Sequence, residues 1–221
     1  MAKLTDIDIA AVDVLRDNAA ADRPGSTPVG APDQMLPHSA PVPPAEAVAV
    51  VDFWRDAGIA RWFAKDANFD RQFRERFLPW HEAAARGELA HWPASATGAL
   101  ALVVLLDQFP RNCFRGTPRM YATDAMARAV TAAAIDAGHD STVETELRLC
   151  FYLPFAHSED LADQERCVTL VRRLGRPHLS HAEGHRDIVR RFGRFPHRNP
   201  ILGRPMTPEE QQFLDDGGYA G

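Results

Sequence analysis

Three segments of the chain combine ionisable side chains with aromatic residues and prolines, and we expect chemistry where these segments meet. The first covers residues 106–116 and has the sequence LDQFPRNCFRG. It places Asp107 at the end of a strongly apolar stretch, where a carboxylate is costly to bury unless Arg111 or Arg115 pairs with it. Two interpretations are open: a structural ion pair that closes a helix, or an arginine fork that binds a carboxylate or phosphate through two hydrogen bonds.

The second segment, residues 151–160 with the sequence FYLPFAHSED, contains a histidine beside two carboxylates. Ser158 suits the N-cap of a following helix with Glu159 and Asp160 in its first turn, so we do not expect Ser158 to be a nucleophile. His157 follows an aromatic run, and the adjacent carboxylates favour acid–base catalysis near neutral pH. A structural histidine is the alternative interpretation.

The third segment, residues 190–200 with the sequence RRFGRFPHRNP, is the most basic part of the chain. Between Arg186 and Arg204 there are six arginines and a single acid, Asp187. Arginines interleaved with phenylalanines can bind single-stranded nucleic acid. The whole chain, however, has a formal charge of −5, whereas nucleic-acid-binding domains are usually basic overall. We therefore expect no nucleic-acid partner, and expect these arginines to pair internally. The expected internal partners are Asp107, Glu159 and Asp160.

These segments predict one site for a small polar or anionic molecule. Arginines of the first and third segments would bind the anionic group, and His157 or His197 would act as general acid or base. A carboxylate would orient that histidine, and three candidates for this role are open. The predicted catalytic residues are Asp107, His157, Glu159, Asp160 and His197. The predicted substrate-binding residues are Arg111, Asn112, Arg115, Tyr152, Gln164, Arg194, Arg198 and Asn199.

The motifs of metal and cofactor sites do not fit this chain, so we predict neither. His181 and His185 lie four residues apart, as helical zinc ligands do, and His178 extends the same face. In a zincin the glutamate directly follows the first histidine, whereas Glu183 is two positions on, and Gly184 weakens the helix between the ligands. The three cysteines have no paired spacing, and phosphate-loop, dinucleotide and haem-attachment motifs are missing from the sequence.

Apolar periodicity predicts that helices position these residues, and no window alternates as a strand would. We expect an all-α domain of about eight antiparallel helices with short links. Pro79 should bend or split its helix, and Pro110 and Pro154 should end theirs. The stripe of Phe69, Phe73, Phe77 and Trp80 should face the core. The expected helices cover residues 45–57, 67–86, 97–108, 123–137, 142–153, 158–174, 178–192 and 207–217.

The first 45 residues differ in composition from the rest. They contain no aromatic residue other than histidine, and seven of the 17 prolines lie between Pro24 and Pro44. We expect residues 1–45 to form a Pro-rich arm with one short helix at Thr5–Ala19, and residues 46–221 to form a single domain. The arm would wrap the domain or stay mobile; a partner-binding tail is the alternative. The longest apolar stretch is far short of the roughly 20 residues that cross a bilayer, and the start is unlike a signal peptide, so we expect a cytoplasmic protein without a membrane partner.

The chain resembles a family of uncharacterised bacterial and plant proteins, the domain of unknown function 924. The resemblance implies an all-helical, tetratricopeptide-like fold, and it brings no established reaction. Among the helical histidines, only His185 fits the family pattern. The motifs that carry the resemblance are DFW at 52–54, RWF at 61–63, LDQFPRN at 106–112, FRG at 114–116, ATD at 122–124, YLPF at 152–155, HSED at 157–160, QER at 164–166, RFGRFPHRN at 191–199, ILGR at 201–204 and TPEE at 207–210.

Our preferred interpretation is an enzyme that needs no redox cofactor and performs hydrolysis, hydration, dehydration or isomerisation. The first alternative is a non-catalytic tetratricopeptide-like module that binds a peptide. The second is a charged network that only fixes helix packing. An enzyme requires that Arg111, His157 and His197 meet at a concave pocket. The sequence makes no prediction of the oligomeric state.

Overall fold

The computed structural model describes residues 41–221, and this part of the chain is all-helical, as expected. It contains eight α-helices of eight or more residues, the number expected from the sequence. They are α1 (Ala45–Ala57), α3 (Ala67–Ala85), α4 (Ala96–Val103), α6 (Asp124–Asp136), α7 (Thr145–Ala156), α8 (Leu161–Val171), α9 (His178–Phe192) and α11 (Pro208–Asp215). Shorter α-helices are α2 (Ile59–Trp62), α5 (Phe109–Cys113) and α10 (Asn199–Leu202). The helix expected at Thr5–Ala19 lies outside the described residues.

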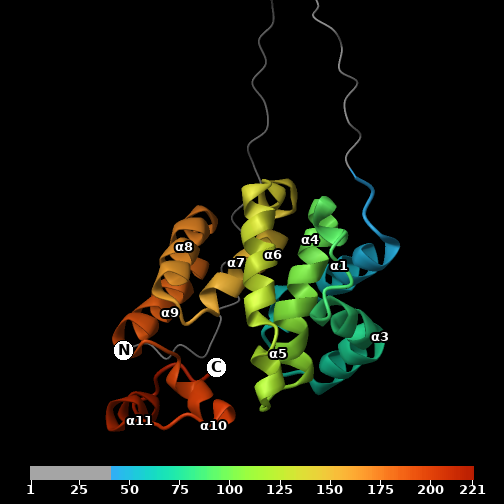
Figure 1. Ribbon diagram of the computed structural model, residues 1–221. Helices are drawn as coiled ribbons and strands as arrows, with labels where there is room; N and C mark the ends of the chain where they lie inside the picture. Colours follow the sequence, from blue (N-terminus) through green and yellow to red (C-terminus); the bar gives the residue numbers. More distant parts are fainter. Residues whose placement is uncertain (1–40) are drawn as a thin grey trace, which may run out of the picture.

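Helices that follow each other in the sequence pack side by side. In Figure 1, α6 lies between α4 and α7, and α8 and α9 form the next pair along the molecule. Helix α1 packs against α4 from the other side. A smaller unit, with α10 and α11, lies below α9 in this view. A second apolar cluster, separate from the main core, consists of Ile188 and Val189 of α9 and Phe195, which follows α9. No helix within residues 41–221 has the length and apolar character needed to cross a bilayer.

The phenylalanine stripe of α3 faces the main core, as expected. Phe69, Phe73 and Phe77 are buried and pack around Phe53 and Trp54 of α1, with ring centroids 5.3–6.0 Å apart. Aromatic pairs at this separation each contribute about 0.5–1.5 kcal/mol beyond simple burial. This aromatic cluster fixes α1 and α3 against the buried central segment that follows.

The central segment differs from the expected single helix ending before Pro110. Helix α4 passes into a π-helical turn, η3 (Val104–Gln108), and then directly into α5. In the π turn the Phe109 amide donates to the Val104 carbonyl, five residues back. The wider turn starts a new helix at Phe109, so Pro110 occupies a first-turn position where its missing amide costs no helical hydrogen bond. The expectation that Pro110 ends the helix was therefore wrong.

Two other prolines also fail to stop or split their helices. Helix α3 continues through Pro79, and α7 continues through Pro154 to Ala156, three residues beyond the expected end at Leu153. Each proline removes one backbone hydrogen bond, and packing of the apolar face outweighs that loss. As a result, His157 is the C-cap residue of α7.

The start of α8 also differs from the expected one. Asp160, and not Ser158, is the N-cap, and its carboxylate accepts hydrogen bonds from the amides of Ala162 and Asp163. Ser158 precedes the helix, accepts a hydrogen bond from the Asp160 amide and donates one to Asp163. A carboxylate and a hydroxyl are both good N-cap groups, so sequence alone did not choose between them.

Candidate functional site

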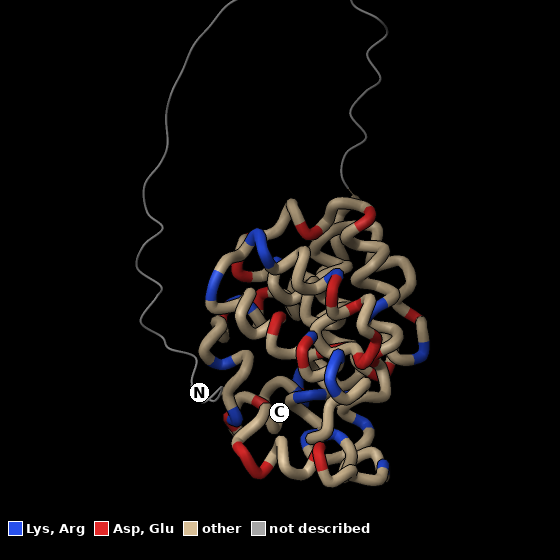
Figure 2. Tube along the Cα trace, turned by 90° about the vertical axis from the view of Figure 1, so that its left-hand side faces the viewer, with Lys and Arg blue, Asp and Glu red and all other residues tan. Residues whose placement is uncertain are grey.

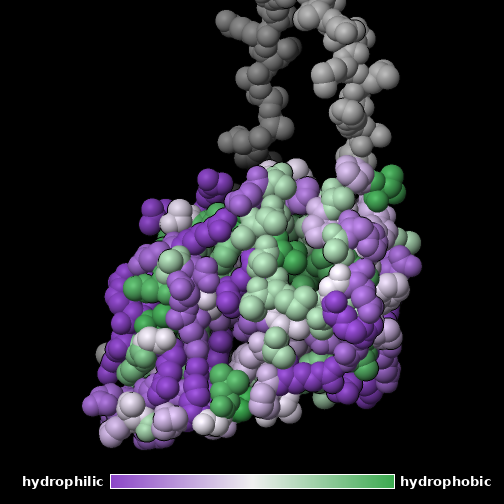
Figure 3. All heavy atoms as spheres, in the orientation of Figure 1, coloured by the Kyte–Doolittle hydropathy of each residue, from purple (hydrophilic) through white to green (hydrophobic). Residues whose placement is uncertain are grey.

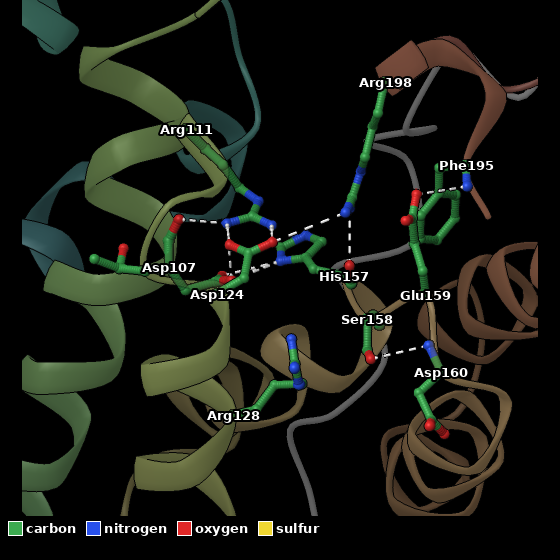
Figure 4. Close-up of polar contacts among 12 residues, drawn as sticks. Asp107, Arg111, Asp124, Arg128, His157, Ser158, Glu159, Asp160, Phe195 and Arg198 are labelled. Carbon is green, nitrogen blue, oxygen red and sulfur yellow. Dashed lines mark hydrogen bonds and ion pairs between the residues drawn. The ribbon is translucent and has the colours of Figure 1, made fainter. Parts of the chain in front are cut away.

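The site is built where the π turn, the end of α7 and the short 3₁₀ helix η7 (Pro196–Arg198) come together. The π turn carries Asp107, α5 carries Arg111, and α6 begins with Asp124. Helix α7 ends at His157, and η7 ends at Arg198. Figure 4 shows the first three side chains meeting His157 from one side and Arg198 reaching it from the other. The three sequence segments therefore do converge.

Asp107 and His157 form a buried carboxylate–imidazole pair. The Nδ1 atom of His157 lies 2.8 and 3.0 Å from the two carboxylate oxygens of Asp107. The Asp107 side chain is fully buried and that of His157 is 14% exposed. With Nδ1–H donating to the carboxylate, Nε2 carries the lone pair, and it has no hydrogen-bond partner among the described residues. This is the arrangement of a histidine base held by an acid.

Positive charge beside Asp107 keeps its carboxylate ionised. Burial alone would raise the pKa of Asp107, but Arg111 and His157 outweigh burial and hold that pKa at about 2. Gln108 also donates to Asp107 over 2.6 Å. For His157, burial and the neighbouring Arg111 lower the pKa, against the opposing effect of Asp107. The pair is therefore a carboxylate and a neutral imidazole at neutral pH.

Arg111 joins Asp107 to Asp124. Its guanidinium lies 3.0 Å from Asp107 and makes two parallel hydrogen bonds of 2.8 and 3.0 Å to Asp124. It also donates to the Asp107 carbonyl. These acids raise the pKa of Arg111 despite its burial. Since its terminal nitrogens are committed to protein acceptors, Arg111 acts on the histidine through Asp107 and is not a free anion binder in this structure.

Arg198 is held less tightly than Arg111. It is 6% exposed, donates to the His157 carbonyl over 2.9 Å, and lies 3.8 Å from Asp124. Its guanidinium lies over the rings of Tyr121 and Phe195, at 4.7 and 4.6 Å from their centroids. Burial and Arg111 lower its pKa, and its Nε atom has no partner among the described residues. Arg198 therefore retains hydrogen-bonding capacity for a ligand.

A cavity of about 340 Å³ opens beside these side chains. This volume lies within the usual range for small-molecule sites. Its polar wall includes Arg111, His157, His197 and Arg198, so the convergence required of an enzyme is present. Other parts of the wall are apolar and come from α2, α7 and α8. These apolar residues include Trp62, Leu149, Leu153 and Val171.

Other predicted residues line the cavity, but their polar groups form hydrogen bonds with other residues of the protein. Asn112 and Arg115 both donate to Asp70, and Tyr152 donates its hydroxyl to Asp140. Arg115 was one of two expected partners of Asp107; the structure gives that role to Arg111. These three residues shape the cavity wall.

The remaining predicted residues lie outside the cavity wall. Glu159 accepts from the Phe195 amide and from Arg204, and Asp160 caps α8, so neither orients His157. The expectation that they could orient the histidine is corrected: Asp107 does so. Buried Gln164 donates to three backbone carbonyls of residues 155–158. Arg194 and Asn199 both bind Glu210.

The basic third segment is largely neutralised by acids other than those expected. Arg190 pairs with Glu165, Arg194 with Glu210, and Arg204 with Glu159. Of the three acids expected as partners, only Glu159 forms one of these pairs. Figure 2 shows acidic and basic positions intermixed along the trace. The space-filling view in Figure 3 is mostly hydrophilic over α8 and α9, and weakly apolar over alanine-rich α6.

Sequence reasoning missed several members of the site. Asp124 belongs to the ATD motif at 122–124, which was noted without a role. His178, His181 and His185 were weighed only as metal ligands, yet all three line the cavity. Their spacing along one helical face was the available signal. Within residues 41–221, no group of three or more His, Cys, Asp or Glu side chains is arranged to hold a metal ion.

Comparison with known proteins bears out the resemblance seen in the sequence. The model of the family "Bacterial protein of unknown function (DUF924)" matches residues 50–218. The solved structure of a protein of unknown function from Agrobacterium tumefaciens is 58% identical, covers 78% of this chain and 98% of its own, and superposes with a TM-score of 0.77. No curated protein matches the chain. The chain thus belongs to the DUF924 family.

Proposed function

We propose that the protein is an enzyme that uses His157 as a general base on a small polar or anionic substrate. The observation that carries this proposal is the Asp107–His157 pair, whose free Nε2 atom belongs to a histidine on the cavity wall. Hydrolysis, hydration, dehydration and isomerisation all need such a base. Arg198, on the same wall, would bind the polar group of the substrate.

The residues around His157 support proton transfer in a defined direction. Nε2 would take a proton from water or from the substrate, and the ionised Asp107 would stabilise the imidazolium that forms. Arg111 keeps Asp107 ionised, which its pKa of about 2 reflects. A positioned base of this kind contributes about 10²–10⁴-fold to a rate.

A thiol nucleophile fits the cavity less well than a base. Cys167 is the cysteine on the cavity wall, and its Sγ atom contacts the Tyr152 carbonyl at 3.6 Å. Burial raises the pKa of Cys167 to about 12, so the thiol is protonated at neutral pH. The thiolate is the reactive form of cysteine, which favours direct base catalysis over covalent catalysis here.

The ion pairs alone would also suit a purely structural network, and one variant separates the two functions. In His157→Asn the amide takes the place of Nδ1 and can still donate to Asp107, while the basic Nε2 is lost. A metabolite library is screened by thermal shift against the wild type, and each stabilising compound is then tested for turnover. We expect His157→Asn to keep compound binding and to lose at least 100-fold in turnover.

The screen also has outcomes that contradict the proposal. If no compound stabilises the wild type while His157→Asn merely melts earlier, the cluster is structural. If a compound is converted equally well by His157→Asn, another residue is the base. Arg191→Met is the matched control, because exposed Arg191 packs on Phe192 and Phe213, outside the cavity.

A further inference from the structure

Three buried nitrogen atoms that have no hydrogen-bond partner among the described residues belong to side chains of one cavity wall. They are Nδ1 of His185, Nδ1 of His197 and Nε of Arg198. Buried polar groups in proteins are nearly always hydrogen-bonded, so three exceptions on one wall need an explanation. A ligand that supplies acceptor oxygens would provide it for Arg198 and for any imidazole nitrogen that carries a proton.

The ring of Tyr219 covers this group of nitrogens. Its centroid lies 4.6 Å from that of His185 and 5.1 Å from that of His197. Phe195 completes the cluster, with its centroid 6.4 Å from Tyr219 and 4.6 Å from the guanidinium of Arg198. The imidazoles are thus packed against a tyrosine ring where a ligand group would otherwise reach them.

Within residues 41–221, Tyr219 is held in place by packing and not by hydrogen bonds. The last backbone hydrogen bond before it joins the Gly218 amide to the Phe213 carbonyl. Residues 219–221 make no hydrogen bond to any described residue, and the Tyr219 hydroxyl is among these unbonded groups. Gly217, at φ 82°, gives the chain a turn just before the tyrosine. The ring can therefore leave without breaking a hydrogen bond to the part of the chain that the structure describes.

The charges nearby indicate which anion fits. Arg111 and Arg204 are closely paired with their acids, and Arg198 is the one arginine of the three with no carboxylate within 3.5 Å. The three arginines balance Asp107, Asp124 and Glu159 one for one. With the imidazoles neutral, these groups carry no net charge, so a dianion is opposed more strongly than a monoanion. A single carboxylate beside Arg198 is the better match, and a bidentate fork suits it.

The rest of the cavity indicates the body of the ligand. Trp62, Leu149, Leu153 and Val171 give the wall an apolar part that a polar metabolite would not fill. Small-molecule sites typically combine such a surface with a few polar groups that fix orientation. A carboxylate joined to a compact apolar body satisfies both parts of the wall.

We propose that Arg198, His185 and His197 form a subsite for an organic monocarboxylate with an apolar body, and that Tyr219 is a cover displaced when this ligand binds. The inference rests on the proposed function and deepens it, because it names the substrate class. The carboxylate would lie next to His157, whose carbonyl accepts a hydrogen bond from Arg198.

Calorimetric titration with benzoate tests the subsite directly. Tyr219→Ala lacks the ring, so binding no longer includes the free-energy cost of displacing it. Benzoate should therefore bind this variant about tenfold more tightly than the wild type. Tyr219→Phe keeps the ring and should bind as the wild type does. Arg198→Lys keeps the charge but loses the fork, and should bind at least tenfold more weakly. Arg191→Met should change nothing.

The outcomes separate this inference from the proposed function. Benzoate binding within threefold of wild type in His157→Asn supports the subsite whether or not a turnover assay succeeds. Equal or weaker binding in Tyr219→Ala overturns the cover, and unchanged binding in Arg198→Lys overturns the subsite. Inorganic phosphate binding as tightly as benzoate overturns the ligand class. No benzoate binding to either the wild type or Tyr219→Ala overturns the inference as a whole.

Discussion

At the scale of single residues, Asp107 decides the charge state of the site. It accepts hydrogen bonds from Gln108 and His157 and lies beside Arg111, although its side chain is fully buried. An isolated carboxylate in this position would be neutral, because burial opposes ionisation. Its partners instead keep it charged, so that His157 is oriented by a carboxylate anion.

Asp107→Asn should reveal this role in two measurements. The substitution keeps the shape but removes the buried anion that lies between Arg111 and His157, so we expect a loss of about 3 kcal/mol in the free energy of unfolding. The pKa of His157 should fall further, since Asp107 raises it more than Asp124 does. Denaturant unfolding and NMR titration of His157 check both effects. An unchanged His157 titration would show that the pair is not coupled.

The buried histidines predict a loss of stability in mild acid. Burial lowers the pKa of His185 and of His197 to about 3, with neighbouring cationic groups acting in the same direction. Because these pKa values lie below the unfolded value near 6.5, the stabilising effect is complete above pH 6.5 and is lost as the pH falls. Between pH 6.5 and 5, each histidine should lower the free energy of unfolding by up to about 2 kcal/mol.

Unfolding experiments at pH 7 and pH 5 test this expectation. His185→Gln and His197→Gln should each show a smaller loss of stability between the two values than the wild type shows. His91→Gln is the control, because His91 is exposed. A loss as steep in both variants as in the wild type would place the acid sensitivity in other groups.

At the scale of elements, the π turn shows what local patterns predict well and what they miss. The apolar run before Asp107 correctly indicated a buried helix. The helix expected from residue 207 is also present, and Thr207 and Glu210 form a capping box at its start. The π turn follows from how the central segment packs between α3 and α6, which no local pattern encodes. As a consequence, Asp107 and Arg111 lie on successive turns, and Asp107 contacts both Arg111 and His157.

Two glycines test how the elements are packed. A Cβ on Gly98 would lie 2.0 Å from the Trp92 carbonyl oxygen, so η2 (Trp92–Ala94) and α4 could not keep their contact. We expect Gly98→Ala to lower the free energy of unfolding by about 2 kcal/mol or more. A Cβ on Gly184 in α9 meets nothing within 4 Å, so Gly184→Ala should stabilise by about 0.5–1 kcal/mol. Thermal unfolding of both variants shows whether each substitution raises or lowers stability. Equal changes in stability would contradict the packing argument.

At the scale of the whole molecule, the limit of sequence reasoning lies in long-range pairing. The three segments and most of their polar residues were identified from composition and motifs. The carboxylate that orients His157 was not identified among the three candidates. Glu159 and Asp160 are close to His157 in sequence, whereas Asp107 is 50 residues away and is brought close by the packing of α7 on η3. For the same reason, Tyr219 became part of the site only through the position of the segment after α11.

The unit of η7, α10 and α11 is joined to the rest of the protein through few polar contacts. Glu159 makes most of them, since it accepts from the Phe195 amide and binds Arg204 with two hydrogen bonds of 2.6 and 2.9 Å. Arg198 adds its bond to the His157 carbonyl. The unit packs on α9 through the small cluster of Ile188, Val189 and Phe195, which is separate from the main core. The unit can therefore open locally while the main core stays folded.

Glu159→Gln should loosen this unit selectively. The variant loses the charged bidentate pair to Arg204, which we expect to cost about 1.5 kcal/mol. Amides of α10 and α11 should then exchange with deuterium roughly tenfold faster, while those of α1, α3 and α4 change little. Glu165→Gln is the matched control, because its pair with Arg190 is exposed and should contribute less than about 1 kcal/mol. Uniformly faster exchange throughout the chain would show that the unit and the main core unfold as one.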